Sequence, residues 1–409
     1  MRARGVLLLG AVLAACGPAE ATDAPRAATT TSPAGWVFEE TPVGAQGDLA
    51  PGSRVVAVDD ATGARTVLSE GCSAAGWPVV HWDGARVLFT ARTGAEAAAL
   101  VECGPDGSAR RVVVRHAGDC GRGAYLPDGR IVYAATLDGT MSDGAPRSAL
   151  FVAAGDGTAG ARITFGAGRD VDPTVLSDGR VLFSSWRPEA GGGRVGLFTV
   201  HPDGTGLAAF HLPAGDAFRA RQTADGDLRF VLRGTDGEQA FVTSWDAPLH
   251  GARALAEPPC AAPDDFRVVE RVPLAAGRRP QGHLSSRRDD RPYGTLVCVD
   301  ARPTDSAGVR VTFVALARDG GGAVARTLGD AELAADGSFA VRVPVDTPLA
   351  LHVTDAAGRV VATDHGPFWL RNNETRVCVG CHDDVETGPP NRRPQAVLGA
   401  PVDLSGGGE

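Results

Sequence analysis

The sequence has no excess of basic residues and no apolar run long enough to span a bilayer. Its 40 Lys and Arg residues are outnumbered by 49 Asp and Glu residues, which gives a net charge of −9. Binding to phosphates needs clustered basic side chains, so we expect no nucleic acid partner. The chain also lacks a Ser-His-Asp order and a glycine-rich phosphate loop, so nothing predicts a hydrolase or a nucleotide-binding site.

The N-terminus has the pattern of an export signal. Arg2 and Arg4 precede an apolar run from Val6 to Ala15, which is too short for a membrane helix and typical of a signal peptide. The run ends in "LAAC", Leu13 to Cys16, which resembles the bacterial lipobox and implies lipidation of Cys16. The alternative is an ordinary signal peptide with small residues before its cleavage site.

The residues after Cys16 agree with a lipid anchor. Gly17 stands where an aspartate would favour retention in the inner membrane, so the outer membrane is favoured. Ala19 to Ala34 is rich in Ala, Thr and Pro and has the composition of a flexible tether. We therefore expect a protein of the cell envelope, attached to a membrane through its lipid and facing the periplasm.

Glycine turns between short apolar runs recur in two interleaved series over the first half of the chain, at a period of roughly 47 residues. One series has turn glycines Gly84, Gly129, Gly179 and Gly226, and the other has Gly63, Gly107, Gly157 and Gly204. Asp-Gly between apolar runs predicts a hairpin, because glycine supplies the positive φ of a tight turn. Two hairpins per period make a four-stranded propeller blade, so the sequence predicts about five blades, with a sixth if flanking segments close the ring.

The repeats resemble the TolB-type propeller family, whose blades carry the turn seen in "PDGRIVYAATL" from Pro127. This resemblance implies a fold and no particular activity. Asp170 and Asp172 in "GRDVDPTVL" are candidates either for ligands lining the central funnel or for side-chain turns before Pro173.

After Cys260 the period is lost and alternating strands predict a small antiparallel β-sandwich, as in "SFAVRVPV" from Ser338. The fold class is therefore all-β, with a β-propeller, then the sandwich, then a tail that carries a cysteine motif. The expected segments are a signal peptide (1–15), a tether (16–34), the propeller (35–258), a connector (259–292), the sandwich (293–370), and the motif segment with its tail (371–409).

"CVGCH" has the spacing that attaches haem c. Two thiols, Cys378 and Cys381, would form thioethers with the haem vinyl groups, and the adjacent His382 would be an axial ligand of the iron. The export signal agrees, because covalent haem attachment takes place outside the cytoplasm. Two alternatives are a zinc site and a disulfide between the two cysteines.

The second axial ligand is not fixed by the sequence. Met141 is the only methionine left once Met1 is removed, so a histidine or an open position is favoured, with His283 and His365 as candidates. For these two and for His352, the alternative is an ordinary surface or strand histidine. Five further cysteines are compatible with two disulfides and one thiol of unassigned pairing: Cys72, Cys103, Cys120, Cys260 and Cys298.

The order of the propeller, "YGTLVCVD" and "WLRNNETRVCVGCHDD" resembles proteins related to the alpha subunit of hydrazine synthase, in particular its middle domain. The resemblance implies haem linked at Cys378 and Cys381. In that family the motif histidine binds zinc and a tyrosine four residues later ligates the iron, whereas here that position is Glu386. A zinc ion at His382 would need a blade cysteine such as Cys103 or Cys120 and an aspartate.

These patterns predict a single-haem lipoprotein that exchanges electrons with an unidentified redox partner docked on the propeller. One alternative is a haem enzyme with an open iron position that acts on a small nitrogen or oxygen species. The other is a haem-free binding or scaffold lipoprotein in which the motif cysteines bind zinc or pair with each other.

Overall fold

The computed structural model describes residues 35–406, except for 142–143, 159, 190–191, 212–214, 224, 235–236, 245–250, 256–261, 264, 303–307, 320–321, 365–366 and 381–391. The described residues form seven four-stranded sheets and one short 3₁₀ helix, which confirms the all-β prediction. None of the helical residues described is part of a segment with the length and apolarity needed to cross a membrane.

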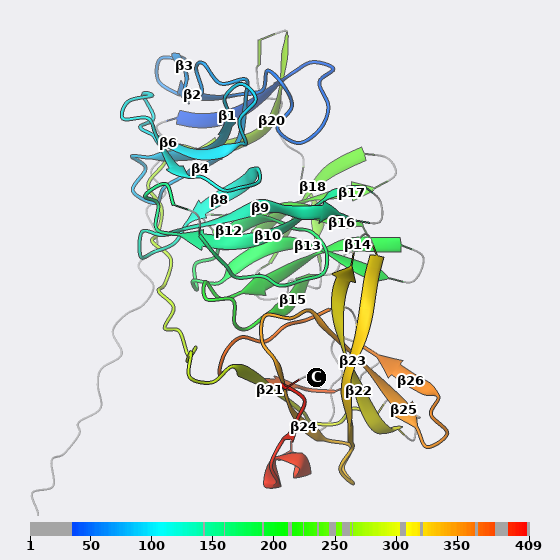
Figure 1. Ribbon diagram of the computed structural model, residues 1–409. Coiled ribbons are helices and arrows are strands. Elements are labelled where there is room, and N and C mark those ends of the chain that lie inside the picture. Colours follow the sequence, from blue (N-terminus) through cyan, green and yellow to red (C-terminus); the bar gives the residue numbers. More distant parts are fainter. Residues whose placement is uncertain are drawn as a thin grey trace, which may run out of the picture. The chain divides into compact units, whose positions relative to one another are not determined.

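Five of the sheets are propeller blades of antiparallel strands, and in four of them all the strands are consecutive in sequence (Figure 1). Blade 1 contains β20 (Phe266–Pro273), β1 (Gly35–Pro42), β2 (Arg54–Asp59) and β3 (Arg65–Val67). Blade 2 contains β4 (Ala74–Val80), β5 (Val87–Arg92), β6 (Ala99–Cys103) and β7 (Arg111–Val114). Blade 3 contains β8 (Cys120–Tyr125), β9 (Ile131–Thr140), β10 (Pro146–Ala153) and β11 (Ala161–Arg162).

The remaining two blades follow in chain order. Blade 4 contains β12 (Asp170–Val175), β13 (Val181–Glu189), β14 (Gly192–Val200) and β15 (Ala208–His211). Blade 5 contains β16 (Asp216–Gln222), β17 (Leu228–Gly234), β18 (Gly237–Thr243) and β19 (Arg253–Ala254). Strand β5, "VLFTAR", is buried at all but its last residue, because its two faces pack into the clusters on either side of blade 2.

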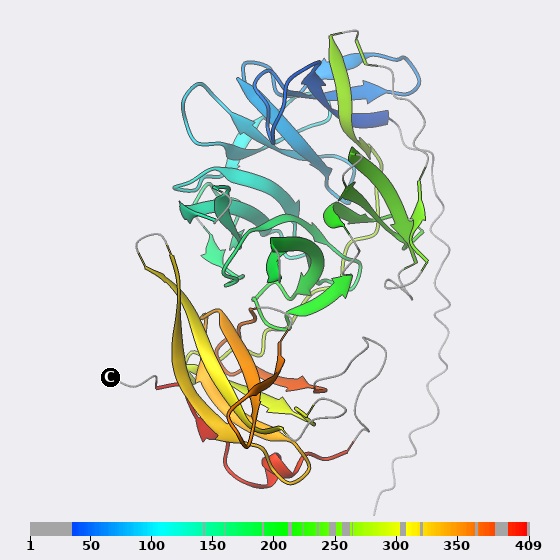
Figure 2. The same ribbon diagram turned by 90° about the vertical axis from the view of Figure 1, so that its right-hand side faces the viewer.

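The ring is closed by β20, which pairs antiparallel with β1 (Figure 2). The chain thus returns to its first blade after completing the fifth, and the described residues form five blades rather than six. β20 lies within the segment expected as a connector (259–292). Its pairing with β1 is not predicted by the sequence, because the two strands are far apart in the chain and no Asp-Gly turn joins them.

The repeat glycines have the backbone conformation of tight turns, as the sequence predicts. All eight have positive φ, between +69° at Gly63 and +95° at Gly157. Beyond β20, residues 277–281 cross the turns of blades 2, 3 and 4. They donate a hydrogen bond to each turn, and the acceptor is the carbonyl of the first turn residue. The donor and acceptor pairs are Gly277 with Trp82, Arg279 with Pro127, and Gln281 with Ser177.

The last two sheets form the predicted sandwich around one apolar core that includes Phe313 and Phe339. One sheet contains β27 (Thr375–Cys378), β21 (Tyr293–Cys298), β24 (Phe339–Pro344) and β28 (Val402–Asp403). The other contains β23 (Gly322–Glu332), β22 (Gly308–Asp319), β25 (Leu349–Asp355) and β26 (Val360–Thr363). The 3₁₀ helix η1 (Gln395–Leu398) precedes β28. β27 and β28 come from the segment expected as a tail, and each joins the first sheet as a parallel edge strand.

Three of the five further cysteines are unpaired thiols: Cys72, Cys103 and Cys120. The expectation of two disulfides among the five is therefore wrong, since only Cys260 and Cys298 remain. Cys103 and Cys120 are buried between blades, and burial raises the pKa of their thiols to about 11 and about 12. Both side chains are packing residues in apolar surroundings.

Candidate functional site

The cysteine motif begins at the end of β27. Cys378 is the last residue of this edge strand, and it lies in register with Cys298 of the parallel strand β21. The backbone N–H of Val299 donates a 3.0 Å hydrogen bond to the carbonyl of Cys378, which fixes the strand end. The Cys378 side chain is half-buried and packs against the sandwich core. Cys381 and His382 lie outside the described residues, as does Cys16.

A carboxyl group with an unused oxygen lies near Cys378. Asp364 directly follows β26, and its Oδ2 is buried with no hydrogen-bond partner. Burial, and to a smaller extent the neighbouring Cys378, raise the pKa of Asp364 to about 7, while Arg187 acts in the opposite direction. The site around Cys378 therefore holds a carboxyl group that is readily protonated.

Arg187 of β13 is a buried cation that acts electrostatically on Asp364. Its side chain is 5% exposed, its guanidinium lies 4.2 Å from the ring centroid of Phe198, and Nη1 donates a hydrogen bond to the carbonyl of Pro367. Nε and Nη2 have no hydrogen-bond partner. Burial lowers the pKa of Arg187, and the carboxylates of Asp170 and Asp364 oppose this effect.

The chemistry of these residues is compatible with a c-type haem. Cys378 is a thiol at the edge of an apolar core, and Arg187 is a buried cation with unused donors. Over the residues that the structure describes, no group of three or more His, Cys, Asp or Glu side chains could hold a metal ion, and Cys381 and His382 are not among these residues.

The candidates for a second axial ligand are spread over the fold. His283 stacks on His201 with a centroid separation of 4.2 Å, and its Nε2 lies 3.2 Å from Oδ2 of Asp203. Burial alone would raise the pKa of Asp203, but hydrogen bonds from Ser285 and Thr205 outweigh it and lower the pKa to about 2. His283 thus has a structural role beside a fixed carboxylate.

The structure describes two further side chains that were considered as axial ligands. His352 lies on β25 opposite Thr363 of β26, and Met141 is buried in the hairpin between β9 and β10. His365 is outside the described residues.

A second candidate site is the central cavity of the propeller, of ≈630 Å³, which receives side chains from all five blades. The inner strands carry β-bulges, and Trp77, Asp172 and Arg219 have positive φ at these bulges. Asp172 accepts a 3.0 Å hydrogen bond from the N–H of Arg219 and lies 3.6 Å from Nε of Arg122. Asp172 therefore lines the funnel, whereas Asp170 is buried and accepts a hydrogen bond from Ser185.

Glu39 of β1 is the most perturbed acid of this cavity. It is 4% exposed, and its Oε2 accepts a 2.9 Å hydrogen bond from the N–H of Trp77. Burial and the neighbouring Glu270 raise the pKa of Glu39 to about 7, although Arg122 acts in the opposite direction. Glu39 was not predicted from the sequence, because a β-bulge in the inner strand leaves no mark in the residue pattern.

Buried ion pairs surround Glu39. Arg122 of β8 donates to Glu270 of β20 in a bidentate pair, with Nη1 3.2 Å from Oε1, and Arg221 of β16 lies 3.6 Å from Oε1 of Glu270. Burial opposes ionisation of Glu270, but the two arginines outweigh it and lower its pKa. The closing strand is thus joined to blades 3 and 5 through one carboxylate.

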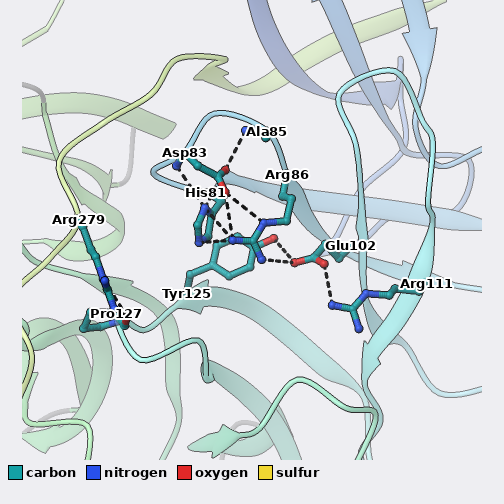
Figure 3. A network of polar contacts seen from close by, with 9 residues as sticks. All are labelled: His81, Asp83, Ala85, Arg86, Glu102, Arg111, Tyr125, Pro127 and Arg279. Atoms are coloured by element: carbon teal, nitrogen blue, oxygen red, sulfur yellow. Dashed lines mark hydrogen bonds and ion pairs between the residues drawn. The ribbon is translucent and has the colours of Figure 1, made fainter.

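A polar network between blades 2 and 3 is a third cluster (Figure 3). Tyr125 donates a 2.8 Å hydrogen bond to Glu102, and Arg86 lies 3.5 Å from the same carboxylate oxygen. Nδ1 of His81 lies 2.8 Å from Asp83. Burial lowers the pKa of His81 and raises that of Tyr125, so both side chains are neutral near pH 7. Because its members bond to one another, this network stabilises the turn between β4 and β5.

The C-terminal region is similar to a known protein family. Residues 299–383 match the family model of the hydrazine synthase alpha subunit middle domain. This region of the chain is related to that subunit, which confirms the resemblance at the level of the domain. No curated protein matches the chain.

Solved structures extend the likeness in fold. Kuenenia stuttgartiensis hydrazine synthase is similar over 90% of this chain and 72% of that chain, with 17% sequence identity and a TM-score of 0.76. Putative TolB from Agrobacterium tumefaciens has a TM-score of 0.41 at 14% identity, over 55% of this chain and 89% of that chain. TolB from Acinetobacter baumannii has a TM-score of 0.40 at 12% identity, over 83% and 65%.

The match to the hydrazine synthase alpha subunit middle domain extends past the cysteine motif. Its residues include Asp364, which precedes the motif, and Cys378 itself. Arg187 lies outside the match, in blade 4, so a buried cation that acts on Asp364 comes from the propeller.

Proposed function

We propose that the chain is a lipid-anchored, single-haem protein of the cell envelope that transfers electrons. Haem c would be attached through Cys378 and Cys381, with His382 as axial ligand of the iron, and the propeller would be the docking surface for a redox partner. The observation that carries this proposal is the position of Cys378, which ends an edge strand of the related domain beside two charged groups with unused polar atoms.

The haem would supply a one-electron couple, and the residues of the chain would set its properties. Cys378 would hold one edge of the macrocycle against the apolar core of the sandwich. This core would limit access of water and so influence the potential. The readily protonated Asp364 would be a nearby site for a proton.

The test is the intact mass and the reduced visible spectrum of the full chain made in bacteria with an active cytochrome c maturation system. We expect a mass gain of one haem and sharp low-spin bands. The variant C378S/C381S should lose the covalent haem, and the control C72S, which removes a thiol outside the motif, should keep it. An unloaded wild-type chain, in cells that mature a control cytochrome, would contradict the proposal and leave a haem-free scaffold.

The same spectrum separates electron transfer from catalysis. Six-coordinate low-spin iron favours electron transfer, since no position is open to a substrate. Five-coordinate high-spin iron would instead favour an enzyme that acts on a small nitrogen or oxygen species.

We also propose that Cys16 carries the lipid and that the protein faces the periplasm from the outer membrane. The support is the "LAAC" pattern and the residue that follows it. Metabolic labelling with a fatty acid and fractionation of the two membranes test this. We expect label on the wild-type chain in the outer membrane fraction, and loss of the label together with release from the membrane in C16S.

A further inference from the structure

Arg187 is a buried cation with more donors than partners. Its side chain is 5% exposed, yet two of its three guanidinium nitrogen atoms, Nε and Nη2, have no hydrogen-bond partner. Leaving a buried donor unsatisfied costs free energy, and the cost is larger for a charged group. A side chain that folds in this way is expected to have a partner of opposite charge.

The acids nearest to Arg187 do not provide that partner. Asp170 acts on it electrostatically, but its Oδ1 accepts a hydrogen bond from Ser185. Asp364 also acts on it, yet Oδ2 of Asp364 is itself buried without a partner. A donor and an acceptor therefore lie near each other, and both are unused.

The face of the guanidinium is already covered. Phe198 lies 4.2 Å from it, and Nη1 is used by the carbonyl of Pro367. The two free nitrogens lie along one edge of the planar group, which is the geometry that binds a carboxylate through two parallel hydrogen bonds. The chemistry of the missing partner is that of a carboxylate.

We propose that Arg187 binds a propionate of the haem held by Cys378. Arg187 thereby makes blade 4 a positioning element for a cofactor attached to the other domain. This inference rests on the proposed function. It goes beyond it by assigning a residue of the propeller, outside the cysteine motif, to the haem.

The test compares R187Q with the unsubstituted residue in two backgrounds, the haem-loaded chain and the haem-free C378S/C381S chain. We expect R187Q to lower the folded-to-unfolded ratio of both proteins. The factor should be roughly ten to a hundred times larger for the haem-loaded protein, because there a propionate loses a charged hydrogen bond. The reduction potential should fall in R187Q, since the nearby cation favours the reduced haem, and R187K should restore part of it.

R122Q is the matched control, because Arg122 is equally buried but is paired with Glu270 in the propeller. It should destabilise both backgrounds alike and leave the potential unchanged. Equal effects of R187Q in the two backgrounds, with an unchanged potential, would overturn the inference alone. If R187Q does not fold, R187K gives the same comparison with a smaller shift of the same sign. An unsubstituted chain without haem would overturn the proposed function, and this inference with it.

Discussion

The indole nitrogen of Trp369 donates a 3.0 Å hydrogen bond to the carbonyl oxygen of Gly204. Trp369 lies two residues before the motif segment, and Gly204 is a turn glycine of blade 4. The Trp369 side chain is completely buried, in one cluster with Phe183 and Phe198 of blade 4. The C-terminal part of the chain thus completes an apolar core of the propeller.

Trp369 should therefore contribute to the stability of the propeller itself. We expect W369A to lower the free energy of unfolding by about 3–5 kcal/mol, the usual cost of removing a large buried aromatic side chain. Urea denaturation measures it. L284A is the control, because Leu284 is 94% exposed and its removal should change stability little. Equal effects of the two substitutions would contradict the packing of Trp369.

Two turn glycines with nearly the same φ should differ in their tolerance of alanine. Gly129 (φ +89°) has no atom within 4 Å of an added Cβ, so G129A should cost only the left-handed strain, about 1 kcal/mol. Gly179 (φ +87°) would place its Cβ 2.3 Å from the carbonyl oxygen of Gln281. G179A should therefore cost about 3 kcal/mol, since strain and overpacking add. Thermal unfolding of the two variants measures the difference, and equal losses would show that Gln281 does not pack against Gly179.

The buried Glu39 should make stability depend on pH. Its folded pKa of about 7 exceeds the ordinary 4.5, so between these values the folded state binds more protons than the unfolded state. Its contribution to stability is thus present at low pH and is lost as the pH rises toward 7, by up to about 3 kcal/mol. E39Q, which is neutral at every pH, should match wild type at pH 4.5 and be more stable at pH 8.

Urea denaturation between pH 4.5 and 8 checks this. E238Q is the control of opposite sign, because arginine partners lower the pKa of Glu238 against the effect of burial, and its contribution is lost as the pH falls. A stability difference between E39Q and wild type that does not change with pH would contradict the raised pKa of Glu39.

The pair of Arg122 and Glu270 should hold the closing strand in place. R122M leaves Glu270 buried without its bidentate partner, and we expect a loss of about 3–5 kcal/mol. Adding E270Q to R122M should recover part of this loss, because the uncompensated charge is then removed. A double variant no more stable than R122M would show that Arg221 suffices to neutralise Glu270.

The residues that show how far the sequence predicts this fold are the turn glycines. Each Asp-Gly turn is a local signal, so the blades could be placed from the chain alone, and the eight positive φ values confirm it. The closing strand could not be placed, because "FRVVERVP" of β20 is an ordinary alternating strand whose partner is set by the return of the ring.

The candidate site also has residues that the sequence predicts and residues that it does not. Cys378 was predicted because thioether chemistry requires a fixed spacing, which is visible in one dimension. Arg187 and Asp364 were not predicted, since each is an ordinary charged residue until the fold buries Asp364 near Cys378 and Arg187 near Asp364. The funnel position of Asp172 was foreseen only as one of two alternatives, because the bulge that turns it inward has no sequence signature.

The return of β20 to the first blade also means that blade 1 is the last blade to receive all its strands during synthesis. β1, β2 and β3 leave the ribosome first, yet the sheet that contains them has no inner strand until Pro273 has been made. Through that interval β1 presents an unpaired edge, and such an edge can pair with the strand of another chain. A chain that ends before Phe266 therefore keeps this edge unpaired, and completion of the fifth blade alone does not cover it.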